Sequence, residues 1–229
     1  MPAADATLRN SIEVGNTPPT APQTLLNLLK LYESDNTDCS IWVDTLESHA
    51  VTLLPFLAAR PPAQLIKWHE AFTLEDLRRG ALTLANQVNL KGIDSLIGQH
   101  QRASQIGLSL GHLVDPALAQ QTALTCRLID HDIAIPDPET TDALTFYDRA
   151  LSTLHGSPLL TRLVAVASHC SVETEIDIDE CASLLFISTA KIDSLLSNLP
   201  LPESAAPITD ISSRFELALN SANLIDSSV

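Results

Sequence analysis

Apolar residues recur along this chain at intervals of three and four positions, the spacing that places side chains on one face of an α-helix. Strict alternation of polar and apolar residues, which is typical of strands, is nearly absent, and the whole chain contains only seven glycines. The pattern therefore predicts an all-α protein of about ten helices. The predicted helices span residues 25–32, 41–46, 51–57, 62–71, 73–88, 93–113, 116–131, 139–154, 158–169, 177–185 and 188–196.

Several predicted helices begin with a recognisable start signal. Three begin with a short polar residue followed by proline, at Asp115-Pro116, Asp137-Pro138 and Ser157-Pro158. Proline is tolerated at the first helical position because the N–H that it lacks would have no partner within the helix. Thr73 marks a fourth start, since its hydroxyl can accept a hydrogen bond from a free backbone N–H and the acidic residues after it favour the helix dipole.

The chain divides into three predicted parts. Residues 1–16 are expected to form a flexible N-terminus, and residues 17–200 one helical domain. Residues 201–229 are expected to contain a linker, Leu201–Ile208, and a last amphipathic helix, Ile211–Leu224, with Phe215, Leu219 and Ala222 on one face. An amphipathic helix of this kind can dock on its own domain or on a partner.

Composition and charge narrow the kind of partner. The 229 residues are 45% hydrophobic but only 4% aromatic, which predicts a sizeable core of aliphatic side chains. The formal net charge of -15 would repel a duplex phosphate backbone and an anionic lipid surface. No apolar stretch approaches the roughly 20 residues of a membrane span. We therefore expect neither nucleic-acid nor membrane binding.

Cysteine spacing and the N-terminal residues bear on the compartment. The four cysteines show no C-x-x-C spacing, which argues against a zinc knuckle or a thioredoxin motif. The segment Met1–Asn10 has no apolar region of the kind found in secretory signals. We expect a cytoplasmic protein with reduced thiols.

The adjacent pair His131-Asp132 follows the apolar-periodic stretch Leu118–Ile129 and is the strongest candidate for chemistry. A neutral imidazole beside a carboxylate can share one divalent cation. Three protein ligands and a water are sufficient for a catalytic zinc ion, which would generate hydroxide and stabilise phosphoryl charge. Three further histidines, His49, His69 and His112, are interpreted as isolated surface or interhelical hydrogen-bonding residues.

The order of segments along residues 17–199 resembles the HDOD family, the HD-related output domain of bacterial signalling proteins. The resemblance rests on an ordered set of segments: Thr17–Pro22 with Leu25–Leu29; His100, Asp115–Ala119 and Leu128–Ile133; and Ser157–Ser168, Asp179–Leu185 and Ser188–Ile192. It implies a compact multi-helix bundle within the HD superfamily. It also implies His100 as a third candidate metal ligand beside His131 and Asp132.

Departures from the family pattern affect the expected chemistry. Ser168 stands where the family has a carboxylate, and Ala134 stands where it has a glycine after His-Asp-Ile. Asp130 or Asp148 could replace the missing carboxylate, although the sequence does not place either at the site. We therefore interpret His100, His131 and Asp132 as vestigial metal candidates that connect helices, and we expect no catalytic residue and no cofactor.

The sequence thus favours a non-catalytic regulatory module that acts through a protein partner in a signalling pathway. The first alternative is a metal-dependent HD-type phosphohydrolase acting on a nucleotide or cyclic dinucleotide, which requires His100, His131 and Asp132 to converge. The second is a small-ligand sensor with an enclosed cavity near His131 in place of the lost active site.

Overall fold

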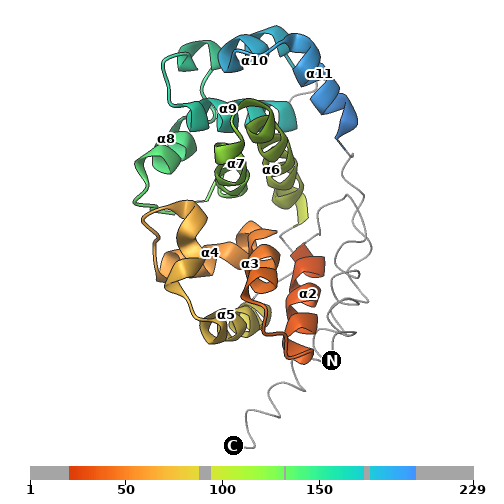
Figure 1. Ribbon diagram of the computed structural model, residues 1–229, viewed down its shortest axis with the longest axis vertical. Coiled ribbons are helices and arrows are strands. Elements are labelled where there is room, and N and C mark those ends of the chain that lie inside the picture. The colour runs from red at the N-terminus through yellow and green to blue at the C-terminus, as the bar shows by residue number, and fades with distance from the viewer. Residues whose placement is uncertain (1–20, 88–93, 132, 173–175, 200–229) are drawn as a thin grey trace, which may run out of the picture.

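The computed structural model describes residues 21–87, 94–131, 133–172 and 176–199 (Figure 1). This part of the chain is entirely helical, with ten α-helices, three short 3-10 helices and no strand, which confirms the predicted all-α class. The predicted N-terminal segment 1–16 and C-terminal segment 201–229 lie outside the described residues. No described helix is both long enough and apolar enough to cross a membrane.

Residues 21–87 form an N-terminal lobe around a core rich in large side chains. Its elements are α2 (Ala21–Glu33), α3 (Cys39–Glu47), α4 (Ala50–Ala59), η1 (Leu65–Ala71) and α5 (Leu74–Gln87). Trp42 and Trp68 are completely buried in this core. Phe56 packs against the Trp68 ring, with 5.6 Å between ring centroids, and meets Phe72 edge-on at 5.3 Å.

Residues 94–199 form a C-terminal lobe with its own core (Figure 1). Its elements are α6 (Asp94–Val114), η3 (Pro116–Leu118), α7 (Ala119–Arg127), α8 (Pro138–Phe146), η4 (Leu151–Leu154), α9 (Leu159–Val172), α10 (Ile178–Leu185) and α11 (Thr189–Asn198). The run Leu163–Ala167 of α9 is fully buried on all sides, so α9 is the central helix of this lobe. A helix segment surrounded in this way is apolar around its whole circumference, as Leu163–Ala167 is.

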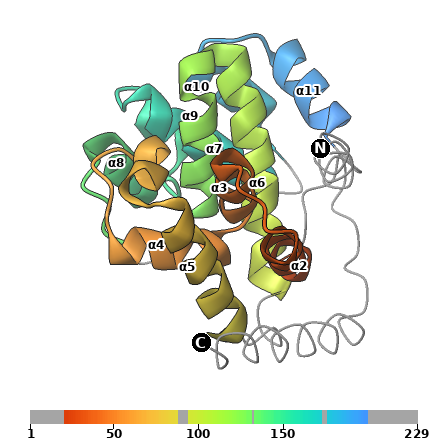
Figure 2. The same cartoon turned by 60° about the horizontal axis from the view of Figure 1, so that its bottom comes forward.

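Helix α7 joins the two lobes. Leu124 and Leu128 point into the core of the N-terminal lobe, whereas Cys126 and Ile129 belong to the core of the C-terminal lobe. In both views α7 lies between the helices of the N-terminal lobe and α9 (Figures 1 and 2). The end of α7 therefore lies at the boundary between the lobes, and the segment that carries His131 follows it directly.

The predicted start signals agree with the observed helix starts. The Asp115 carboxylate accepts a hydrogen bond from the Ala117 N–H at the start of η3. The Thr73 hydroxyl accepts from the Asp76 N–H while the Asp76 carboxylate accepts from the Thr73 N–H, which is a reciprocal capping box. These bonds satisfy backbone donors that the helices leave free at their first turn.

Three predicted helices differ from the structure. The predicted helix 62–71 is the 3-10 helix η1, and the predicted helix 116–131 contains η3 and α7 and ends at Arg127, before the left-handed residue Asp130. The predicted helix 139–154 is divided into α8 and η4, because Ala150 adopts an extended ψ of 130° that no helix can accommodate. The apolar periodicity continues across this break, so the sequence pattern alone did not indicate it.

Candidate functional site

The structure brings together two of the three predicted metal candidates. His100 lies on α6 and His131 follows α7, and both are half-buried at the boundary between the lobes. Their ring centroids are 5.8 Å apart, with the planes inclined by 44°. The third candidate, Asp132, lies outside the described residues.

Asp130 provides the carboxylate that faces this histidine pair. Its backbone is left-handed, with φ at 63°, a conformation that costs a non-glycine residue roughly 1–3 kcal/mol. One carboxylate oxygen, Oδ2, lies 3.6 Å from His100 Nε2, and the other accepts a hydrogen bond from the Tyr147 hydroxyl. Asp130 therefore links α6 to the end of α8. Both replacement carboxylates considered from the sequence are exposed, but Asp130 contacts His100, whereas no described contact joins Asp148 to either histidine.

Burial sets the protonation of the groups around Asp130. It lowers the pKa of His100, against the opposing effects of the Asp130 charge and a hydrogen bond to the Ile129 backbone. Burial also lowers the pKa of His131, and the charge of His100 lowers it further. Burial and the hydrogen bond to Asp130 raise the pKa of Tyr147 to about 12. At neutral pH both imidazoles are therefore neutral and Tyr147 keeps the proton that it donates.

The structure adds His49, which we interpreted from the sequence as an isolated surface or interhelical hydrogen-bonding residue. It lies between α3 and α4, but it is neither on the surface nor hydrogen-bonded through its ring to any described residue. His49 immediately precedes α4 and is only 2% exposed, and neither ring nitrogen has a hydrogen-bond partner among the described residues. Burial lowers its pKa to about 4, and the charges of Arg127, His131 and His100 act in the same direction. His49 is thus close enough to the other two histidines for their charges to affect its pKa, although it lies 51 and 82 positions away from them in the sequence.

A buried set of polar groups connects the lobes beside His49. The Arg127 guanidinium donates a hydrogen bond to the Glu47 backbone carbonyl, and the Glu47 carboxylate accepts one from Trp68 Nε1 at 2.7 Å. Burial lowers the pKa of Arg127 and raises the pKa of Glu47. Buried polar groups are stable only when they have partners, so this set specifies how α7 meets α3 and η1.

We tested whether the described residues fit a metal centre. Among them, no group of three or more His, Cys, Asp or Glu side chains is arranged to hold a metal ion. Ser168, which stands at the family's carboxylate position, is half-buried on α9, and its backbone carbonyl accepts a hydrogen bond from the Ser171 hydroxyl. The described part of the cluster therefore does not form a closed cage, and its contacts connect α6, the end of α7 and the end of α8.

Two surface grooves lie away from the histidine cluster, on either side of α11. The first separates α6 from α11 and has a volume of about 560 Å³. The second, of about 490 Å³, lies between the start of α10 and α11 and is lined partly by Asp177, Asp179 and Asp193. Neither groove is lined by His100 or His131.

Comparison with known proteins does not assign the chain to a family: no family model, curated protein or solved structure matches it.

Proposed function

We propose that this protein is a cytoplasmic regulatory module, a divergent relative of the HDOD domains, that acts by binding a protein partner and not by catalysing a reaction. The order of the segments quoted above supports the relationship. The contacts of the histidine cluster support a structural role for the pair His100 and His131. The proposal of a protein partner rests on the exposed side chain of Phe186.

Phe186 is an aromatic residue displayed on the surface in a backbone conformation that favours glycine. It directly follows α10, its side chain is 76% exposed, and its φ is 56°. The Ile187 N–H donates to the Ala182 carbonyl and the Phe186 N–H to the Ser183 carbonyl. This pair of bonds is the Schellman motif, in which the left-handed position is usually glycine. Phenylalanine here costs stability and exposes apolar area, and neither is explained by folding.

Arg162 holds the Phe186 ring in place on the surface. The guanidinium carbon lies 5.3 Å from the ring centroid, a distance typical of cation–π contacts. Its Nη1 donates to the Leu184 carbonyl at 2.9 Å, which fixes the guanidinium under the ring. A preorganised aromatic residue loses little entropy on binding, and aromatic and arginine side chains dominate the energetics of protein interfaces. We infer that Phe186 inserts into an apolar pocket of the partner.

The partner can be identified and the proposal tested with two sets of variants. A photoreactive phenylalanine analogue at position 186, in cells that produce the protein naturally, should give a covalent adduct with one partner. The same analogue at Val172, which is 58% exposed and is the other large exposed apolar residue in the described part of the chain, should not. With the purified partner, Phe186→Gly should raise Kd by about 30-fold or more, the effect of losing a central interface residue, whereas Val172→Ala should not change it.

Phe186→Gly also separates binding from folding. Glycine relieves the left-handed strain, so the variant should unfold at a temperature equal to or higher than that of the wild-type protein. Loss of binding in a fully folded and more stable variant would support the proposal. Equal adducts at positions 186 and 172, or an unchanged Kd for Phe186→Gly, would contradict it.

A metal-dependent phosphohydrolase acting on a nucleotide or cyclic dinucleotide is a second candidate, favoured by the approach of two neutral imidazoles at His100 and His131. Neutral imidazole is the form that binds metals. Elemental analysis of the purified protein and of a His131→Ala/Asp132→Ala double variant tests this candidate. Stoichiometric iron, manganese or zinc that is lost in the variant would support it, and no metal in either protein would contradict it.

A further inference from the structure

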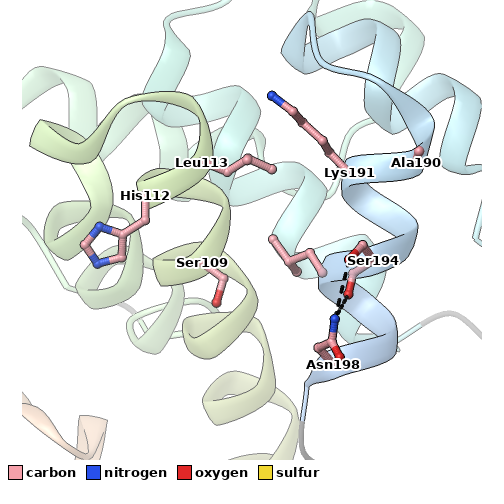
Figure 3. A pocket seen from close by; sticks show the side chains of 8 residues that line it. Ser109, His112, Leu113, Ala190, Lys191, Ser194 and Asn198 are labelled. Carbon is pink, nitrogen blue, oxygen red and sulfur yellow. Dashed lines mark hydrogen bonds between the residues drawn. The ribbon is translucent and has the colours of Figure 1, made fainter.

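The groove between α6 and α11 is suited to one face of an amphipathic helix. Its wall is mostly apolar, with Leu113 of α6 and Leu195 of α11 among the lining residues. Leu113 points across the gap toward α11, while Ser109 and Ser194 lie lower along the same gap (Figure 3). The volume of about 560 Å³ accommodates a few side chains but not a whole helix. An occupant would therefore insert a row of side chains and leave its polar face in solvent.

The charge of the groove differs from that of the whole chain. The chain carries 28 acidic and 13 basic residues, yet the described lining includes Lys191 and His112 and no carboxylate. Lys191 extends from α11 toward α6 at one end of the gap (Figure 3). An acidic occupant would thus meet a positive charge here that most of this surface does not offer.

The chain itself supplies an occupant of matching chemistry. Asn198, one of the lining residues, ends α11, and residues 200–229 follow it outside the described part of the structure. In that segment Ile211, Phe215 and Leu219 recur every four positions, which predicts one apolar stripe on a helix. Residues 200–229 contain four carboxylates and one arginine. Residues 200–229 as a whole are therefore acidic, whereas the predicted helix 211–224 contributes the apolar stripe and carries one carboxylate and one arginine.

The connection between groove and segment is short. Twelve residues, 199–210, separate the end of α11 from Ile211 and can span at most about 43 Å. This length reaches any point along the groove. A short linker also gives the tethered segment an effective concentration in the millimolar range, which favours it over a free partner helix of similar affinity.

We propose that the segment Ile211–Leu224 docks as an amphipathic helix in the α6–α11 groove of its own chain, with Phe215 inserted between Leu113 and Leu195. The docked segment covers the groove and competes with any partner helix for it. This inference does not depend on the binding role of Phe186, which lies at the end of α10 and outside the lining of this groove.

The test measures how well the groove is covered in the full-length chain. Ser194 is exposed among the described residues, so a thiol introduced by Ser194→Cys should react quickly with a maleimide unless the segment covers it. Cys39→Ser removes the exposed native thiol, and the three other cysteines are buried. Against this background, Phe215→Asp should speed labelling about tenfold, the effect of uncovering a groove that is covered about 90% of the time.

Ser213→Asp is the matched control, because it adds the same charge on the opposite face of the predicted helix. It should leave the labelling slow. Equal labelling rates in the parent protein and the Phe215→Asp variant would overturn the proposal, whether both are fast or both are slow. Shielding that disappears on dilution would also overturn it, because the occupant would then be a second copy of the chain.

Discussion

His49 illustrates how one buried side chain makes the stability of this protein depend on pH. Its pKa is about 4 in the folded protein against 6.5 for an unperturbed histidine. Between these values the unfolded chain binds the proton and the folded chain does not, so acid favours unfolding. The stabilising effect of the neutral ring is complete above pH 6.5 and is lost as the pH falls toward 4. The total loss is about 3 kcal/mol.

Urea unfolding at several pH values between 7.5 and 4 measures this effect. His49→Leu removes the titrating ring and its two unpartnered nitrogen atoms. From pH 7.5 to pH 4, the free energy of unfolding should therefore fall by about 3 kcal/mol less in this variant than in the wild-type protein. The variant must be compared with the wild-type protein because burial also raises the pKa of Glu47, and protonation of Glu47 stabilises the folded state as the pH falls. His155→Gln, at an exposed position, should follow the wild-type protein. Parallel curves for His49→Leu and wild type would contradict the prediction.

Residue-scale prediction from the sequence succeeded where the signal was local. His131 was conspicuous because it directly follows an apolar-periodic stretch, and His100 entered through its place in the order of segments. His49 has no such signal: it comes near the other two only because the turn between α3 and α4 meets the end of α7, where Arg127 bonds to the Glu47 carbonyl. Its burial depends on contacts between residues far apart in the chain, which periodicity does not encode.

At the scale of elements, the closest packing in the C-terminal lobe depends on glycine. Gly107 and Gly111 lie one turn apart on α6, where η3 and α7 approach. A Cβ atom at Gly111 would lie 2.4 Å from the Ala119 Cα and 3.0 Å from its backbone N. At Gly107 it would lie 3.0 Å from the Cys126 sulfur. The contact at Gly111 is with backbone, so it can be relieved only by moving one helix.

Gly111→Ala should therefore destabilise the protein. Overpacking of this kind costs about 1–3 kcal/mol, and the higher helix propensity of alanine returns up to about 1 kcal/mol. We expect a net loss of about 1–2 kcal/mol, seen as a thermal midpoint that is lower by several degrees. Gly156→Ala is the control, since nothing lies within 4 Å of its added Cβ and it should leave the midpoint unchanged or slightly raised. A Gly111→Ala variant as stable as wild type would show that the helices separate without cost.

Element starts were predicted better than element ends. Aspartate and threonine caps mark starts because the side chain and the backbone groups that it satisfies are neighbours in the chain, as at Thr73 and Asp115. The end of α7 lies instead next to Asp130, whose carboxylate bonds to Tyr147 across 17 positions, and the break between α8 and η4 lies at Ala150, where no side chain marks it. The left-handed turn at Asp130 places its carboxylate between His100 and Tyr147. The same contact that could not be predicted thus shapes the candidate site.

At the scale of the molecule, the two cores unfold as one unit only if the contacts between the lobes, which we call the joint, are strong. Arg127 is central to that joint, because α7 belongs to both cores and its guanidinium bonds to the Glu47 carbonyl. Both tryptophans, Trp42 and Trp68, are buried in the N-terminal lobe, so tryptophan fluorescence follows that lobe alone. Far-UV circular dichroism follows the helices of both lobes. The two signals should coincide during urea unfolding of the wild-type protein.

Arg127→Leu should separate the two signals. The variant leaves the buried Glu47 carbonyl without its guanidinium donor. This should lower the stability of the N-terminal lobe and of its contact with α7 by about 1–3 kcal/mol. With m-values of about 1–3 kcal/mol/M, the fluorescence midpoint should fall below the circular dichroism midpoint by roughly 1 M urea. Arg149→Leu, at an exposed arginine over the Phe146 ring, should keep the midpoints together. Equal shifts of both signals in Arg127→Leu would mean that apolar side chains of α7, and not this arginine, couple the lobes.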